Sequence, residues 1–335
     1  VEVVSVRVGD VQPWSGPRGG GTVVGVRASG IGVWLASSSG VGLRCGFGEA
    51  SGRWRGWSSG GYGLRCMSSS SPVSGWVGVH LSAYAVGSVS SGGSFYYHAG
   101  LSSFGAAPPL GPERGGTRVA VLVAGSVRDA YTLRCGFGTG ISIEGSFGSS
   151  GMSSVLARHL DESQVECCAP LHSSVASGVR LSMNGQQYAL SGPSFTYQRA
   201  ASVRSASPSR VVSEGGTPVT VRGVGFSSSS ESVGWLVCRV GGGVRRARWS
   251  GSGACVCNST RGTASSGSAR VEVSNNGREY ASGAAWVEVV SVRVGDVQPW
   301  SGPRGGGTVV GVRASGVGAW LASSTGVGLR CGFGE

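Results

Sequence analysis

Short runs in which every second residue is apolar recur along this chain, separated by clusters of Gly, Ser and Pro. The segments 119–123, 219–221 and 271–273 are examples, and turn-forming residues flank each of them. Strict alternation sends one row of side chains to a buried face of a sheet and the other row to solvent, so the pattern predicts strands. Only residues 152–166 hint at a helix, and that segment is short. The sequence therefore predicts an all-β protein.

The chain contains one long stretch twice. Residues 1–49 return as residues 287–335, with three differences in 49 positions: Ile31 becomes Val317, Val33 becomes Ala319 and Ser39 becomes Thr325. A repeat this faithful predicts that the chain samples a longer tandem array.

A shorter phrase, Gly-Gly-Thr before a Val-rich strand, divides the long repeat further. Its threonines are separated by 95, 100 and 91 residues, and they are Thr22, Thr117, Thr217 and Thr308. These spacings indicate three diverged copies of one module of about 100 residues, the size of an immunoglobulin domain. We expect modules at residues 1–98, 99–197 and 198–286, and the first half of a further copy of the first module at 287–335.

Each module presents the same order of features. An opening strand and a Pro/Gly turn precede the Gly-Gly-Thr phrase. A central strand with one cysteine follows, then a second cysteine group, an alternating strand and a closing strand with aromatic residues.

This order resembles the IPT/TIG domain, an immunoglobulin-like β-sandwich. Residues 214–226, Glu-Gly-Gly-Thr-Pro-Val-Thr-Val-Arg-Gly-Val-Gly-Phe, resemble the family most fully, whereas the first module has Val-Arg-Ala-Ser-Gly at 26–30 in place of the final Gly-x-Gly-Phe. The resemblance implies tandem sandwiches, as in extracellular stalks and receptors; the family also supplies a domain of some DNA-binding transcription factors. Residues 284–290 run from a closing strand toward the next opening strand without a Gly/Ser or Pro tract, which favours a stiff rod.

Within this resemblance, the nine cysteines fit one disulfide per sandwich. The pairs are Cys45 with Cys66, Cys135 with Cys167 or Cys168, and Cys238 with Cys255 or Cys257. Cys331 is the copy of Cys45. One cysteine of each neighbouring pair is left over and is free to bridge modules or neighbouring chains. A metal site made by the Cys-Cys and Cys-x-Cys groups is a weaker alternative, because these spacings miss the usual zinc-ligand pattern.

Two further motifs suggest sugar chemistry. Asn258-Ser259-Thr260 is an N-glycosylation sequon, which is used when it lies on an accessible surface of a secreted protein. Trp54-Arg55-Gly56-Trp57 has the Trp-x-x-Trp spacing of C-mannosylated tryptophan, although packing with a neighbouring Arg explains it as well. Trp14 and Trp34 are candidates for sugar stacking, subunit packing or core positions.

The distribution of charge and the positions of the histidines narrow the classes of function that we expect. The net charge is +12, and all 28 basic residues are Arg, scattered mostly singly, so we expect no nucleic acid partner. The four histidines stand apart from any paired carboxylates or Ser-His-Asp spacing, so we expect neither an enzyme nor a cofactor. No apolar run reaches the 18 residues of a membrane span.

These observations predict a structural repeat protein of an extracellular or cell-surface filament or stalk. Its expected partners are further copies of itself and covalent glycans. The alternative is a receptor or adhesin ectodomain that binds glycan or protein.

Overall fold

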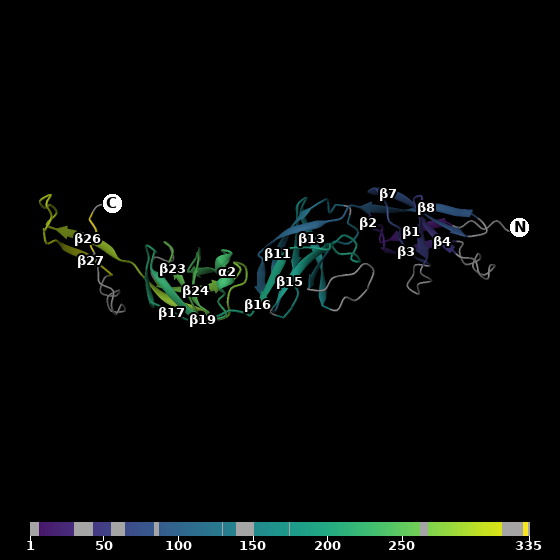
Figure 1. The fold of residues 1–335 in the computed structure, drawn as a ribbon. Coiled ribbons are helices and arrows are strands. Elements are labelled where there is room, and N and C mark those ends of the chain that lie inside the picture. Colours follow the sequence, from purple (N-terminus) through teal and green to yellow (C-terminus); the bar gives the residue numbers. More distant parts are fainter. Residues whose placement is uncertain are drawn as a thin grey trace. The chain divides into compact units, whose positions relative to one another are not determined.

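The computed structural model describes residues 7–29, 43–54, 64–83, 87–128, 130–138, 151–173, 175–261, 267–316 and 331–333. The chain divides into two compact units, one of Val1–Pro109 with Gly115–Thr196 and the other of Leu110–Arg114 with Tyr197–Glu335. The described elements are strands except for one helix of five residues, α2 (Ser228–Ser232), so the prediction of an all-β protein is confirmed (Figure 1). No helix in the described residues is long and apolar enough to cross a membrane.

The first unit begins with eight strands joined in the order β1-β3-β6-β5-β4-β7-β8-β2. Their bounds are β1 (Arg7–Gln12), β2 (Ser15–Pro17), β3 (Val23–Ser29), β4 (Leu43–Phe47), β5 (Ala50–Trp54), β6 (Leu64–Met67), β7 (Gly75–Ala83) and β8 (Gly87–His98). Strand β5 pairs with both β4 and β6, so it connects two faces of a sandwich. Val24 and Val26 of one face and Phe47 and Phe95 of the other belong to one buried core.

The same arrangement follows in the rest of the first unit. The strands are β9 (Ser102–Ala107), β11 (Arg118–Ala124), β12 (Arg134–Gly138), β13 (Met152–Asp161), β14 (Gln164–Cys168), β15 (Ala176–Ser182) and β16 (Ser194–Gln198). Here β13 pairs with both β12 and β14 and takes the place of β5. Strand β11 is buried at every second residue, as the alternation predicts.

The expectation of a helix at 152–166 is wrong, because β13 and β14 form a hairpin there. The chain reverses at Glu162 and Ser163, where the carboxylate of Asp161 accepts from the main-chain N–H of Ser163 at 2.8 Å. Such short side-chain bonds favour turns over helices. Ladders on both sides then satisfy the main chain of β13.

The second unit contains β10 (Leu110–Pro112) and two sheets, β17-β19-β23-β22 and β18-β25-β24-β20-β21. Their bounds are β17 (Ser202–Ser207), β18 (Arg210–Val212), β19 (Pro218–Val224), β20 (Val237–Val240), β21 (Gly243–Arg246), β22 (Arg248–Gly251), β23 (Ala254–Asn258), β24 (Gly267–Ser274) and β25 (Ala285–Val290). Ala247 interrupts the strand that joins the two faces in the earlier sandwiches, so β21 and β22 belong to different sheets.

The second unit ends with a hairpin of β26 (Arg293–Gln298) and β27 (Gly311–Ser315). Strand β25 runs on to Val290, so the expected module limit after residue 286 lies inside this closing strand, and β26 starts three residues later at Arg293. The module limits after residues 98 and 197, like this one, stay predictions.

The Gly-Gly-Thr phrase forms the same corner at each of its four occurrences. Both glycines have φ between +73° and +91°, a region that side chains with a Cβ rarely adopt; they are Gly20, Gly21, Gly115, Gly116, Gly215, Gly216, Gly306 and Gly307. The corner explains why this phrase repeats while the loops around it differ.

Candidate functional site

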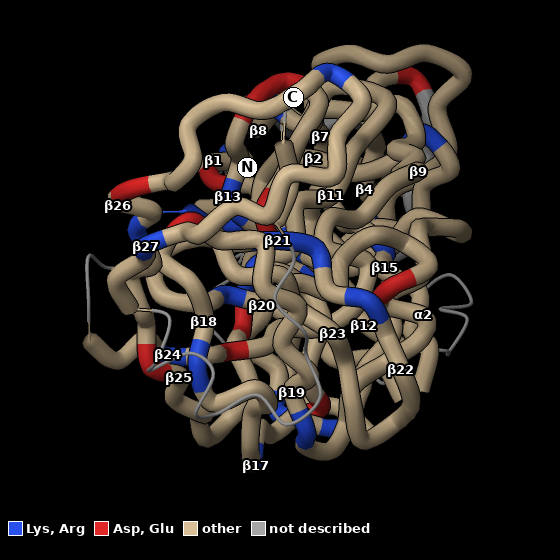
Figure 2. Tube along the Cα trace, turned by 90° about the vertical axis from the view of Figure 1, so that its left-hand side faces the viewer, with Lys and Arg blue, Asp and Glu red and all other residues tan. Residues whose placement is uncertain are grey.

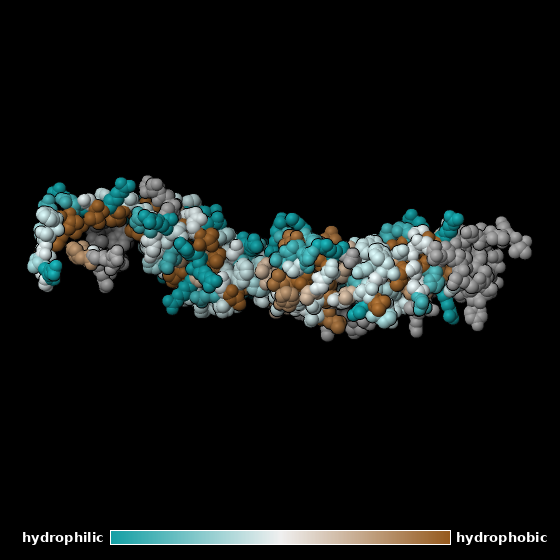
Figure 3. Space-filling view, turned by 90° about the horizontal axis from the view of Figure 1, so that it is seen from above, coloured by the Kyte–Doolittle hydropathy of each residue, from teal (hydrophilic) through white to brown (hydrophobic). Residues whose placement is uncertain are grey.

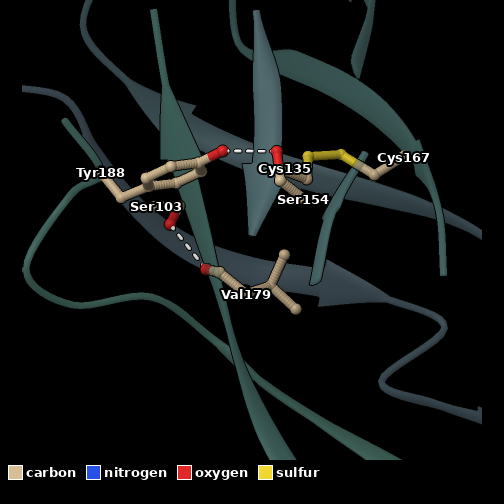
Figure 4. The surroundings of a disulfide bond; sticks show 6 residues. All are labelled: Ser103, Cys135, Ser154, Cys167, Val179 and Tyr188. Atoms are coloured by element: carbon tan, nitrogen blue, oxygen red, sulfur yellow. Dashed lines mark hydrogen bonds between the residues drawn. A yellow bond between two sulfur atoms is a disulfide. The ribbon is translucent and has the colours of Figure 1, made fainter. Parts of the chain in front are cut away.

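One disulfide lies in each of the three complete sandwiches. The bonds join Cys45 to Cys66, Cys135 to Cys167, and Cys238 to Cys257, with Cα atoms 6.1 to 6.3 Å apart. In the first two sandwiches the central strand is thereby tied to a strand of the opposite face, and all six residues are 0 or 1% exposed. Figure 4 shows the second bond, with Tyr188 and Ser154 hydrogen-bonded beside it.

Strand alternation explains why Cys168 and not Cys167 remains a thiol, but it does not separate Cys255 from Cys257. Cys167 and Cys168 are consecutive, so one is buried and the other exposed. Cys255 and Cys257 are two apart, so both face the core, and Cys255 is a buried thiol. Burial in apolar surroundings raises the pKa of the Cys255 thiol to about 12. A bridge from Cys255 to another module or chain is therefore incompatible with its burial, whereas Cys168 and Cys331 are exposed.

The alternative prediction was a metal site formed by the Cys-Cys and Cys-x-Cys groups. Two of its four ligands, Cys167 and Cys257, form disulfides instead. Among the described residues, no group of three or more His, Cys, Asp or Glu side chains is placed to hold a metal ion.

The sequon lies directly after a disulfide cysteine, where β23 meets the Gly-Gly-Thr corner. Asn258 is the last residue of β23 and is exposed, whereas Ser259 and Thr260 are 4% and 8% exposed. Ser259 accepts through its main-chain oxygen from Gly216 N–H at 2.9 Å, and its hydroxyl accepts from Thr217 N–H at 3.0 Å. The Asn258 side chain is thus presented at the surface by a fixed backbone.

Sequence reasoning missed a set of polar contacts between the two sandwiches of the first unit. We call it the joint, and residues 184–187 form it. The loop after β15, Asn184-Gly185-Gln186-Gln187, reaches strands β2 and β3. The side-chain amide of Gln186 donates to the main-chain oxygen of Val23 and accepts from the Val23 N–H, both at 2.8 Å. This amide therefore pairs with the backbone of β3 as a neighbouring strand would.

Asn184 holds this loop in shape and adds contacts of its own. Its Oδ1 accepts from the N–H groups of Gln186 and Gln187 at 3.0 and 3.2 Å. Its Nδ2 donates to Gln187 Oε1 at 2.7 Å, and to Ser15 O and Thr22 Oγ1 at 3.3 Å. Asn184 is 5% exposed, so the oxygen and the nitrogen of its side-chain amide both form hydrogen bonds in a buried position.

Aromatic side chains lie beside this joint. The hydroxyl of Tyr131 donates to Gln12 Oε1 at 3.1 Å, and its ring meets Trp14 edge-on with centroids 6.3 Å apart. Trp14 stacks on Trp76 at 5.5 Å, and Trp76 contacts Tyr96 at 5.3 Å. Trp76 is 60% exposed, so this aromatic row reaches solvent.

A second loop of the same type occurs in the second unit. Residues 274–280, Ser-Asn-Asn-Gly-Arg-Glu-Tyr, match residues 182–188, Ser-Met-Asn-Gly-Gln-Gln-Tyr, at four of seven positions. Asn276 Oδ1 accepts from the N–H groups of Arg278 and Glu279 at 3.0 Å. Its Nδ2 donates to Glu279 and to Leu110 O, the latter at 3.1 Å. This shared spacing is the signal by which the joint was detectable in the sequence.

The positive charge is spread along the chain and partly paired. Basic and acidic positions are both scattered along the trace (Figure 2). Arg210 pairs with Glu288 at 2.6 Å, and Arg239 with Glu272 at 3.2 Å. Of the tryptophans discussed from sequence, Trp34 and Trp57 lie outside the described residues, as does the Trp54 side chain.

A comparison with solved structures gives distant likenesses. The extracellular region of Plexin A4 has a TM-score of 0.42 and 13% identity, over 90% of this chain and 26% of that one. The Escherichia coli adhesin FdeC has a TM-score of 0.26 and 15% identity, over 85% of this chain and 96% of that one. Invasin, a bacterial integrin-binding protein, has a TM-score of 0.22 and 9% identity, over 88% of this chain and 62% of that one. This chain spans 26% and 42% of the lengths of the two plexin structures.

Comparison with curated proteins gave no significant match. The family comparison did give one, because the sequence profile of the IPT/TIG domain matches residues 201–285. These residues contain strands β17 to β24, the third disulfide and the Glu-Gly-Gly-Thr phrase. Residues 201–285, which make up most of the third sandwich, are therefore an IPT/TIG domain.

Proposed function

We propose that this chain is a structural repeat segment of an extracellular or cell-surface filament or stalk, without a catalytic role. The observation that carries the proposal is the joint of Asn184, Gln186 and Gln187 on strands β2 and β3. Side-chain amides bonded to main-chain groups at a buried site fix one sandwich against the next within the first unit. A joint of this kind suits a spacer, in which neighbouring sandwiches must keep a constant relative orientation.

Three further features support the proposal. Two concern the extracellular setting, and the third concerns self-association. One buried disulfide in each complete sandwich suits an oxidising compartment, where such bonds persist. Asn258 of the sequon is exposed, as a covalent glycan requires. The near-identical return of residues 1–49 at 287–335 provides equivalent surfaces for self-association into a filament.

The joint is tested with two spin labels in the first unit of the full chain. The labels are attached through Arg27→Cys and Arg158→Cys, both exposed positions, in a Cys168→Ser, Cys331→Ser background. We expect one narrow distance distribution, which broadens in Asn184→Asp. A broad distribution in the parent chain contradicts a fixed joint.

Filament formation is tested separately with material secreted from eukaryotic cells. We expect concentration-dependent assembly in sedimentation experiments and filaments with a regular axial repeat in negative stain. Monomers at every concentration contradict the filament but leave the spacer role of the joint intact.

A second candidate function is that of a glycan-binding ectodomain. The row of Trp14, Trp76 and Tyr96 favours it, because exposed aromatic faces pack against sugar rings. A glycan array probed with the parent chain and with Trp76→Ala discriminates between the two functions. Binding that Trp76→Ala abolishes supports the ectodomain, and absence of binding by the parent chain contradicts it.

A further inference from the structure

The core of the third sandwich contains three buried cysteines, whereas each of the first two sandwiches buries two. Cys238, Cys255 and Cys257 are 1%, 0% and 0% exposed, and they belong to one cluster of core residues. Figure 3 shows apolar residues, in brown, at the surface in several places along the chain. The thiol of Cys255 is not exposed, so its reaction partners in the folded sandwich are confined to the core.

The position of Cys255 is aliphatic in the other two sandwiches. Two residues before the bonded cysteine of the same strand stand Leu64 in the first sandwich and Val165 in the second. In the third sandwich this residue is Cys255. All three side chains are 0% exposed. An aliphatic residue therefore meets the packing requirement, and the sulfur of Cys255 adds a chemical capacity that the other two sandwiches lack.

Cys255 and Cys257 face the same bonded partner. Both project from β23 into the core that contains Cys238 of β20. The Cα atoms of Cys238 and Cys257 are 6.1 Å apart, and a disulfide spans Cα separations up to about 7 Å. Residues two apart on a strand are separated by about 7 Å. A slide of β23 past β20 by at most about 7 Å therefore brings Cys255 to the place that Cys257 occupies.

The two sheets of the third sandwich share no strand, which permits such a slide. In the first two sandwiches β5 and β13 each pair with strands of both faces. In the third, Ala247 separates β21 from β22, and these belong to different sheets. A slide of one face along the other would break the ladders of β5 or β13 but leaves both sheets of the third sandwich intact. Isolated bonds between the sheets, such as Val203 N–H to Ser282 O at 2.8 Å, open first.

We propose that the third sandwich has two disulfide isomers, one with Cys238 bonded to Cys257 and one with Cys238 bonded to Cys255, which exchange within the core. The thiolate of Cys255 attacks Sγ of Cys238, so that a bond forms between these two sulfurs while the bond to Cys257 breaks. Cys257 leaves as a thiolate and takes up the proton that Cys255 released. The exchange therefore needs no external oxidant or reductant. This inference does not depend on the proposed function.

Burial determines when the exchange takes place. It raises the pKa of the Cys255 thiol to about 12, so this thiol stays protonated in the closed sandwich near neutral pH. Because the thiolate is the attacking species, the exchange accompanies an opening of the two sheets. The sandwich thereby keeps a covalent link between its faces in two different registers.

The experiment uses the oxidised full chain with Cys168→Ser and Cys331→Ser, which leaves Cys255 as its free thiol. The chain is held at pH 8.5 without external thiol, in urea below the unfolding transition. It is then unfolded and alkylated with N-ethylmaleimide in acid, where exchange stops. Peptide mass spectra locate the label. We expect label on both Cys255 and Cys257, with the lesser share about 1% or more.

Two outcomes of this experiment overturn the proposal. One is label on Cys255 alone at every time and urea concentration. The other is label that spreads equally to Cys135 and Cys167, because exchange then follows unfolding of the whole chain. The variant Cys255→Val gives the third sandwich the residue of the second, and it should abolish the label on Cys257.

A matched pair of variants in the same background tests the second isomer directly. In Cys257→Val we expect Cys238 to bond to Cys255, so that neither takes up label. In Cys167→Val the equivalent place holds Val165, so Cys135 stays a thiol and is labelled. Label on both Cys238 and Cys255 in a Cys257→Val chain that resists proteolysis as its parent does overturns the proposal. If that variant does not fold, the label shares in the parent chain decide.

Discussion

The side-chain amide of Asn184 donates to the main-chain oxygen of Ser15 at 3.3 Å, across 169 positions of the sequence. Ser15 begins β2, and Asn184 lies in the loop after β15, so this bond connects the two sandwiches of the first unit. Both residues are buried, at 0% and 5% exposure. A buried amide donor that loses its acceptor costs about 1–3 kcal/mol, which makes this bond a test of the joint.

We expect Asn184→Asp to loosen the joint without unfolding either sandwich. The carboxylate keeps the acceptor role toward Gln186 and Gln187 but loses the donor and faces the Ser15 oxygen. The amide of Val23, which donates to Gln186, should exchange with solvent about tenfold faster or more. Gln298→Glu, on the exposed strand β26, is the matched control and should leave this exchange unchanged.

Removing a disulfide should lower the stability of its own sandwich. Cys45 and Cys66 are 21 positions apart, so loss of the cross-link in Cys45→Ser with Cys66→Ser costs about 3 kcal/mol through the freedom of the unfolded chain. Urea denaturation followed by the fluorescence of the first unit measures this loss. Cys168→Ser removes an exposed thiol and should change the free energy of unfolding by less than about 0.5 kcal/mol. Equal effects of the two changes would contradict the bonded role of the first pair.

The buried thiol of Cys255 should make stability fall at alkaline pH. Its pKa rises from an ordinary value near 9.0 to about 12 on folding, because burial disfavours the thiolate. Below pH 9 both states hold the proton and the contribution is fully present. Between pH 9 and 12 the unfolded chain releases the proton, so stability falls by about 1.4 kcal/mol per pH unit.

The variant Cys255→Ala isolates this effect in a Cys168→Ser, Cys331→Ser background. Between pH 8 and 10.5 the parent should lose about 2 kcal/mol more than the variant in free energy of unfolding. Parallel curves for the two proteins would show that Cys255 does not titrate on unfolding. Native alkylation of the unmodified chain at pH 8 should label Cys168 and Cys331 but not Cys255.

We expect a glycan on Asn258 when the chain is secreted from eukaryotic cells. Asn258→Gln should remove one N-glycan from the intact mass and leave stability within about 0.5 kcal/mol, because the side chain is exposed. Enzymatic deglycosylation of the parent should give the same mass shift. Thr260→Ala also deletes the sequon, but Thr260 is buried, so its effect on folding would obscure the result. An unchanged mass in Asn258→Gln means that the sequon is not used.

Much of the fold was predictable because strand alternation and corner glycines act locally. Val119, Val121 and Val123 face the core as their spacing predicts. The partner of Cys238 was not predictable in this way, because Cys255 and Cys257 face the same side and alternation cannot distinguish them. At β14 the alternation does distinguish Cys167 from Cys168, because Val165 and Cys167 share the buried face.

The joint could not be predicted from the sequence for a different reason. A polar stretch such as 184–187 is typical of a solvated turn, and its partners Ser15 and Val23 are more than 160 positions away. Long-range contacts of this type have no periodicity in the sequence. The spacing shared by 182–188 and 274–280 is the one local sign of it.

Several contacts of the joint use main-chain atoms on its receiving side, at Ser15 and Val23, and this has a consequence for how such an array can diverge. Asn184 uses the oxygen of Ser15, and Asn276 uses the oxygen of Leu110, a residue of quite different chemistry. Every residue type offers that oxygen. At these main-chain contacts the receiving residue can therefore change type during evolution without loss of the bond, while the requirement for amide chemistry is confined to a few loop positions and that for a hydroxyl to Thr22 of the Gly-Gly-Thr corner.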